Sequence, residues 1–152
     1  MTQNRDLVRE RRSMLAGMTP VLKGGIYFFC STDDVSVAAA ADSLASFRED
    51  EGISLVLTEA AAIKHGFDRS MPMSRIILEV YSALEGVGLT ASVATALADQ
   101  GVPCNMIAAY HHDNVFVPQA MRHRAIEILK EVQRAASHQQ VDGLSAKASL
   151  LP

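Results

Sequence analysis

The chain has 152 residues and a formal net charge of -3, with 49% hydrophobic and 20% charged residues. This length and apolar share favour one ordinary domain, or two small units that share a core, and argue against general disorder. The fourteen Lys and Arg residues form no dense basic run, which argues against binding to a nucleic-acid backbone.

The sequence contains no signal for secretion, membrane insertion or zinc binding. Met1 to Arg12 is polar and charged, and no apolar run approaches the roughly 18 residues that span a bilayer. Cys30 and Cys104 lie in apolar surroundings, without the spacing of a zinc site. We therefore expect a cytoplasmic protein with reduced cysteines, no membrane contact, no bound metal and no cofactor.

The first half of the chain alternates helical and strand-like segments. Alanine-rich, capped or amphipathic stretches predict helices, and β-branched or aromatic runs predict strands. The predicted elements are a helix over Asp6 to Ala16, a short segment Val21 to Lys23 before a Gly24-Gly25 turn, a strand over Ile26 to Cys30, a helix over Val35 to Ser46, a charged loop over Phe47 to Gly52, a strand over Ile53 to Leu57, and a helix from Thr58 to about His65.

Phe67 to Met73 is the clearest linker, and the second half begins after it. Apolar residues alternate in the first strand and recur at helical spacing in the helix that follows. The predicted elements are a strand over Ile76 to Tyr81, a turn over Ser82 to Gly88, a helix from Leu89 to Gly101, strands over Val102 to Tyr110 and Asn114 to Val117, a helix over about Gln119 to Ala136, and an unstructured tail over Ser137 to Pro152 with a short strand as an option near Gln140 to Leu144.

The order strand, helix, strand, strand, helix in the second half is that of a ferredoxin-like βαββαβ unit without its final strand. The first half is a compatible but incomplete version of the same unit. Because either half alone has too few strands, we expect the halves to complete or cover each other. The expected domains are residues 1–70 and 74–136, with 137–152 as a disordered tail.

Two long motifs, SALEGVGLT at Ser82 to Thr90 and NMIAAYHHDNVFVP at Asn105 to Pro118, resemble a family of small bacterial proteins built from two ACT-like domains. GIYFFCS and FREDEGISLVL in the first half are similar to the same group. The resemblance covers about residues 14–135. It implies an α+β fold of two ferredoxin-like ACT units, with antiparallel sheets that carry helices on one face. ACT domains are the ligand-sensing units attached to aspartate kinases and other enzymes of amino-acid metabolism.

The resemblance also implies a ligand site, because ACT domains typically bind an amino acid against the turn from the first strand into the first helix and the start of the second strand. A glycine-bearing turn exposes backbone amides at a helix N-terminus, where the helix dipole favours a carboxylate. Glu85 can meet an ammonium group, and Asn105 can both donate and accept. The expected ligand-binding residues are Ser82, Glu85, Gly86, Val87, Gly88, Leu89, Thr90, Asn105, Met106 and Ile107.

Structural explanations compete with these roles. Gly86 and Gly88 can serve only the geometry of a tight turn, and Asn105 can hydrogen-bond locally. His111-His112-Asp113 at the predicted hairpin tip suits packing or dimer contact, or a metal or acid-base role. Adjacent histidines in a strand point to opposite faces and therefore chelate poorly. The sequence has no nucleophile elbow, phosphate-binding loop or HExxH motif, so no catalytic residues are assigned.

We therefore expect a non-catalytic regulatory or sensing protein that binds a small molecule, an amino acid being the favoured ligand, as a homodimer and with an enzyme as a possible partner. One alternative is an interaction and oligomerisation module without a ligand. The other is an enzyme that uses the tip from His111 to Asp113.

Overall fold

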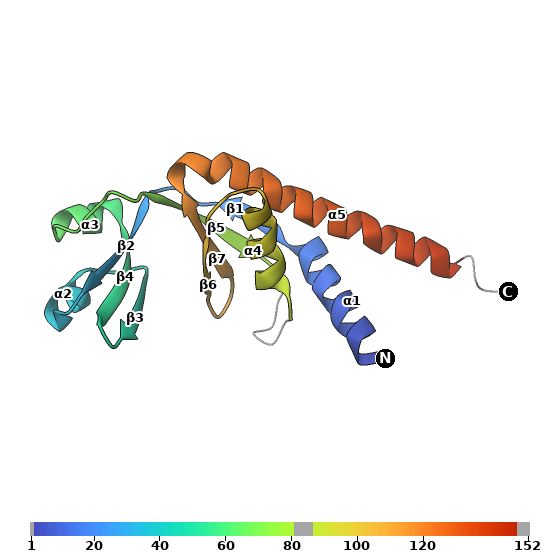
Figure 1. Ribbon diagram of the computed structural model, residues 1–152, viewed down its shortest axis with the longest axis horizontal. Helices are drawn as coiled ribbons and strands as arrows, with labels where there is room; N and C mark the ends of the chain where they lie inside the picture. Colours follow the sequence, from blue (N-terminus) through green and yellow to red (C-terminus); the bar gives the residue numbers. More distant parts are fainter. Residues whose placement is uncertain (1, 81–86, 149–152) are drawn as a thin grey trace.

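The computed structural model describes residues 2–80 and 87–148, with side chains described for 10–80 and 87–138. Figure 1 shows the strands in two groups, with short helices beside the first group and one long helix running over the second. The strands are β1 (Thr19–Leu22), β2 (Tyr27–Thr32), β3 (Ala45–Glu49), β4 (Gly52–Thr58), β5 (Met73–Glu79), β6 (Asn105–Ala108) and β7 (Asp113–Pro118). The helices are α1 (Thr2–Gly17), α2 (Val35–Ala40), α3 (Glu59–Lys64), α4 (Leu89–Asp99) and α5 (Arg122–Ala148), with a 3-10 turn, η1 (Gln119–Met121), before α5.

The C-terminal unit is completed by a strand from the N-terminus. β5 pairs with β7, β7 pairs with β6, and β1 adds antiparallel to the free edge of β5, with Val21 opposite Ile77. The order β1-β5-β7-β6 is that of a ferredoxin-like sheet in which β1 stands where the final strand belongs. The expectation that the two halves complete each other is confirmed by this pairing.

The N-terminal unit has the order β3-β4-β2, and all its pairs are antiparallel. A single residue pair, Tyr27 opposite Met73, continues this sheet into β5. The two units therefore share one sheet through a narrow junction. Mixed helices and antiparallel strands in two ferredoxin-like units confirm the predicted fold class.

Each unit has helices on one face of its sheet. In the C-terminal unit, Ile76, Leu78 and Val115 point into a core that includes Val93 of α4 and Leu129 of α5. The predicted alternation in β5 is thus confirmed for its described residues, because Ile76 and Leu78 are fully buried and Glu79 is exposed. In the N-terminal unit, a second core packs β2 and β4 against α2 and α3.

α1 packs against α5 and adds to the core of the C-terminal unit, so the N-terminus belongs structurally to the second half of the chain. Met14 and Met18 are buried in that core, and the Gln133 side-chain amide donates to the carbonyl oxygen of Ala16 at 2.9 Å. Within the described residues, no helix is both long and apolar enough to cross a membrane.

The structure corrects the sequence prediction between α2 and β4. The predicted helix over Val35 to Ser46 ends at Ala40, and the predicted charged loop contains a strand, β3. Asp42 adopts a left-handed backbone conformation with a φ of 47°, which is incompatible with helix continuation. β3 lies at the sheet edge and is mostly exposed, so it lacks the alternation of apolar residues that identifies a half-buried strand.

The predicted tail is also wrong over most of its length. α5 continues without a break to Ala148, about 40 Å of helix at 1.5 Å per residue, and no strand forms near Gln140 to Leu144. Ser137, the first residue of this extension, is half-buried, and its hydroxyl donates to the carbonyl oxygen of Gln133 at 3.0 Å. Residues after 148 lie outside the described part of the chain.

Candidate ligand-binding site

Seven of the ten predicted ligand-binding residues can be placed. Ser82, Glu85 and Gly86 lie outside the described residues. Val87, which is 55% exposed, and Gly88 lead into α4, and Leu89 and Thr90 are its first two residues. Asn105, Met106 and Ile107 begin β6, the edge strand of the C-terminal unit.

Gly88 is the N-cap of α4 and has a left-handed backbone with a φ of 98°. It provides no side-chain cap, and the first amide within α4 that finds a partner is Ser92, which donates to the Gly88 carbonyl oxygen at 3.0 Å. In contrast, Asp34 caps α2 by accepting hydrogen bonds from the amides of Ser36 and Val37. Among the described residues, the amides at the start of α4 are therefore left without acceptors.

The buried side of α4 fixes the position of this turn. Leu89, Val93 and Leu97 are at most 2% exposed and follow the spacing of one helix face. Because Leu89 is both the first helical residue and a core residue, the amides beside it, which have no acceptor among the described residues, are held in place by packing.

Arg11 of α1 lies directly over Gly88. A Cβ atom built on Gly88 would lie 2.6 Å from Cδ of Arg11 and 3.1 Å from its Cγ. The site thus combines an arginine side chain with the positive end of a helix dipole, two features that attract the same anionic group. Sequence reasoning missed Arg11, because it lies 77 positions before Gly88 and no local pattern links the two.

The three β6 residues do not share one surface. Met106 pairs with Val115 and packs against the core under the helices. Asn105 pairs with Phe116, and Ile107 packs with a small cluster that includes Phe116 on the opposite, helix-free face. Asn105 is exposed and begins β6, whereas Ala108, three residues later, ends it. Ala108 pairs with Asp113, which in turn pairs with Leu78 near the end of β5. The structure thus separates Asn105 from the start of α4.

A buried amide stabilises the helix-free face of β6 and β7. Asn114 is 7% exposed, accepts a hydrogen bond from Nε of Arg75 at 2.9 Å, and donates to the carbonyl oxygens of His112 and Ile107 at 3.1 and 3.3 Å. These contacts link β5, β7 and the turn that follows β6. They hold the hairpin of β6 and β7 against β5.

The histidine tip lies at the surface. His111 and His112 are exposed, and the ring of Tyr110 stands edge-on to His111 at 5.0 Å. Across residues 10–80 and 87–138, no group of three His, Cys, Asp or Glu side chains is placed to hold a metal ion. The tip residues line neither of the two clefts described below.

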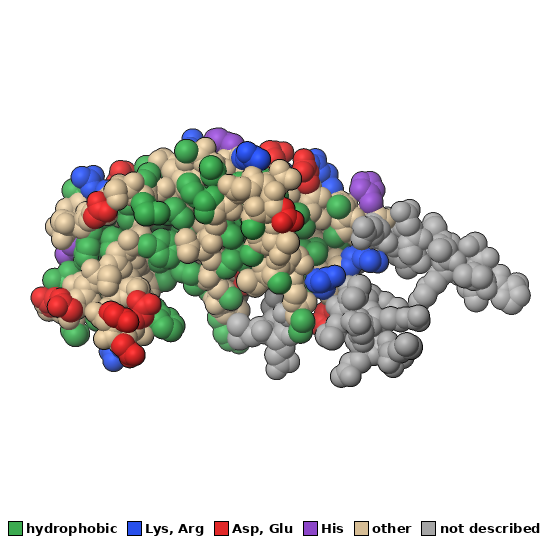
Figure 2. Space-filling view, in the orientation of Figure 1, with side chains coloured by type: hydrophobic (Ala, Val, Ile, Leu, Met, Phe, Trp, Pro, Cys, Tyr) green, Lys and Arg blue, Asp and Glu red, His purple; other side chains and the backbone are tan. Residues whose placement is uncertain are grey.

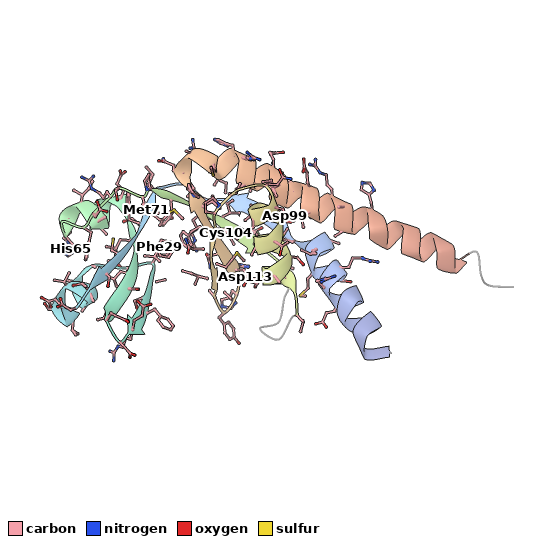
Figure 3. All side chains as sticks on the ribbon, viewed as in Figure 1. Phe29, His65, Met71, Asp99, Cys104 and Asp113 are labelled. Carbon is pink, nitrogen blue, oxygen red and sulfur yellow. The ribbon has the colours of Figure 1, made fainter. Side chains whose placement is uncertain are left out.

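Asp113 differs from its histidine neighbours. It pairs with Leu78, so its side chain belongs to the helix-covered face at the end of the sheet where the chain leaves β5 for α4 (Figure 3). Burial raises the pKa of this carboxyl above its ordinary value. A half-buried acid of this kind gains from a cationic partner.

The two cysteines are free thiols, each half-buried. Burial raises the pKa of Cys30, with a further contribution from the charge of Asp68, and burial alone raises the pKa of Cys104. Both thiols are thus less reactive than an exposed thiol, because the thiolate is the nucleophilic form.

Comparison with known protein families shows which family the chain belongs to. The family description of an ACT domain matches residues 8–74, and a second ACT domain description matches residues 74–131. The protein therefore belongs to the ACT domain family and carries two ACT domains in tandem. Such domains are typically regulatory and bind small molecules. No functionally curated protein matches the chain.

Solved structures agree with this assignment. A Vibrio cholerae protein of unknown function, described as a possible transport protein, is 38% identical, with a TM-score of 0.75 over 84% of this chain and 98% of that one. An Agrobacterium tumefaciens protein is 15% identical, with a TM-score of 0.61 over 76% of this chain and 89% of that one. The ligand-free regulatory subunit of aspartate kinase from Thermus thermophilus is 11% identical, with a TM-score of 0.56 over 76% of this chain and 98% of that one. At identities of 15% and 11%, the last two similarities support a shared fold only.

Proposed function

We propose that this protein is a non-catalytic regulatory module that binds an amino acid at the start of α4. The carboxylate of the ligand accepts hydrogen bonds from the first amides of α4 and pairs with Arg11. The site also contains Val87, Gly88, Leu89 and Thr90, and Ser82, Glu85 and Gly86 precede them in the sequence.

The position of Arg11 over Gly88 is the observation that carries this proposal. A cation beside the positive end of a helix is unfavourable unless an anion lies between them. Among the described residues, the single ion pair joins Lys130 to Glu127, so no described carboxylate compensates Arg11. A ligand carboxylate at the start of α4 is the partner that we propose for Arg11.

The ammonium group of the ligand requires an acid, and two residues are suitable. Glu85 precedes α4 in the sequence, and Asp113 pairs with Leu78 near the end of β5 and has a pKa raised by burial. An ammonium group next to Asp113 stabilises its charged form. Asn105 lies on the edge strand β6, away from the start of α4. It would contact only a ligand long enough to extend across the β6–β7 hairpin.

A thermal-shift panel of the standard amino acids at millimolar concentration tests this function. A ligand at about 100 times its dissociation constant stabilises the folded protein by about 2.7 kcal/mol. Arg11→Gln should remove the response to a ligand that stabilises the wild type, and Arg48→Gln, an equal charge change on the exposed strand β3, should keep it. If no amino acid raises the melting temperature of the wild type, the proposed function is wrong.

Self-association is a second function with its own support. β3 and β6 are edge strands of the sheet, Phe47 of β3 is 70% exposed, and Tyr110, in the turn after β6, is 78% exposed. Exposed strand edges invite pairing with another chain. We propose a homodimer that also presents the ligand site to an enzyme partner. Sedimentation analysis tests it, and a strictly monomeric protein at all concentrations would contradict it.

A further inference from the structure

A second cleft lies at the other end of β5 from the α4 turn. It has a volume of about 320 Å³ and is formed by the connection from β1 to β2, the start of β5, and the turn before α5. Its polar lining consists of Lys23, Gly24, Gly25, Ser74, Gln119 and Arg122. None of the residues that line it is acidic.

Both cations of this cleft lack an acidic partner within the described residues. Arg122 is half-buried, and one of its terminal nitrogens, Nη1, donates to the carbonyl oxygen of Gln119 at 2.8 Å. Its other donors have no acceptor among the described residues, and Lys23 forms no ion pair with them. The remaining donors of this half-buried guanidinium are available to an anion in the cleft.

Ser74 adds a hydroxyl to the lining of the cleft, and the residue as a whole is 2% exposed. The amides of Gly24 and Gly25 donate to no described residue, and the loop is held by the Tyr27 hydroxyl, which donates to the Gly24 carbonyl oxygen at 3.3 Å.

An apolar cleft of about 530 Å³ adjoins this one and shares Gln119 and Arg122 with it. Its other walls include Met71, Pro72 and Pro118. Met71 lies on the segment between α3 and β5 (Figure 3) and is 74% exposed. Figure 2 shows hydrophobic side chains exposed in this part of the surface, between the two units.

We propose that the two clefts together bind a small molecule with an anionic head group, a carboxylate or a phosphate, and an apolar body. The head group lies among Lys23, Arg122, Ser74 and the two glycine amides, and the body covers Met71 and the prolines. Because no acid lines the head-group cleft, a ligand with an α-ammonium group is disfavoured there. The chemistry thus differs from that of the amino-acid site at α4, and the two sites occupy opposite ends of β5.

Amide chemical shifts of the full-length protein, titrated with four probes, test this site. The probes are 4-methylpentanoate, acetate, 4-methylpentyl phosphate and inorganic phosphate, and leucine serves as the ammonium-bearing counterpart of the first. We expect saturable shifts at Gly24, Gly25 and Ser74 with 4-methylpentanoate or its phosphate counterpart. Acetate, inorganic phosphate and leucine should bind more weakly at these residues. The stronger of the two branched probes identifies the head group.

Two variants assign the binding to the cleft. Arg122→Gln and Lys23→Gln should each weaken the branched probe by about tenfold, the loss typical of one charge-assisted hydrogen bond. Arg124→Gln, an exposed arginine on the same helix, should bind as the wild type does. Lys23→Gln keeps the test decisive if Arg122→Gln impairs folding, because Lys23 is exposed. Wild-type affinity in both cleft variants, or no shift at Gly24, Gly25 and Ser74 with any probe, overturns the proposal.

Discussion

Gly88→Ala changes both the backbone of the α4 turn and the position of Arg11. The backbone φ of 98° lies in the left-handed region, where a residue with a Cβ costs about 1–2 kcal/mol. The new Cβ would lie 2.6 Å from Cδ of Arg11, so this side chain must move away from the turn. Arg11 is exposed and flexible, so its displacement adds little to the loss of stability.

For a chain of this size, a loss of about 1–2 kcal/mol lowers the melting temperature by about 2–8 °C. Differential scanning fluorimetry measures this shift with and without any amino acid that stabilises the wild type. We expect Gly88→Ala to be less stable and to lose the response to the ligand.

Gly101→Ala is the matched control. Gly101 also has a left-handed backbone, with a φ of 69°, but a Cβ there meets no atom within 4 Å. It should lose a similar amount of stability and keep the response to the ligand. If Gly88→Ala melts at the wild-type temperature, or still responds to the ligand, the reasoning about this turn is refuted.

Three further predictions concern stability. Asn114→Ala removes three hydrogen bonds from a buried site and should lower the free energy of unfolding by about 1–3 kcal/mol in urea, and an unchanged midpoint would contradict this. Burial raises the pKa of Asp113 in the folded state, so the charged carboxylate opposes folding, and stability falls as the pH rises through that pKa. Asp113→Asn should therefore be more stable than the wild type at neutral pH. This advantage should vanish below the ordinary pKa of an aspartate, where the carboxyl is protonated in both the folded and the unfolded state. Met18→Ala should cost about 2–5 kcal/mol because Met18 is fully buried, whereas Met71→Ala, at a side chain that is 74% exposed, should change stability by less than about 0.5 kcal/mol.

The sequence predicts most of the C-terminal unit because its elements have strong local patterns. The alternation around Ile76 and Leu78 and the stripe of Leu89, Val93 and Leu97 both reflect burial on one face. The sequence also shows that the second half lacks the final strand of a βαββαβ unit. Its replacement by β1 could not be derived, since a four-residue strand carries no information about its partner.

The N-terminal unit was less predictable. The alanine-rich run from Val35 has high helix propensity throughout, but Asp42 ends it, and the exposed edge strand β3 lacks a periodic signal. The candidate site was predicted only in its local part. Gly88 and Leu89 follow from the turn and the helix pattern, whereas Arg11 and Asp113 reach the site through tertiary packing and strand pairing.

The central claim is that an amino acid binds at the start of α4, and amide chemical shifts measured during titration with each standard amino acid test it most directly. We predict saturable shifts at Gly88, Leu89, Thr90 and Ala91 with one or a few of them, and loss of these shifts in Arg11→Gln. If none of these amides shifts with any amino acid at millimolar concentration, the claim is contradicted.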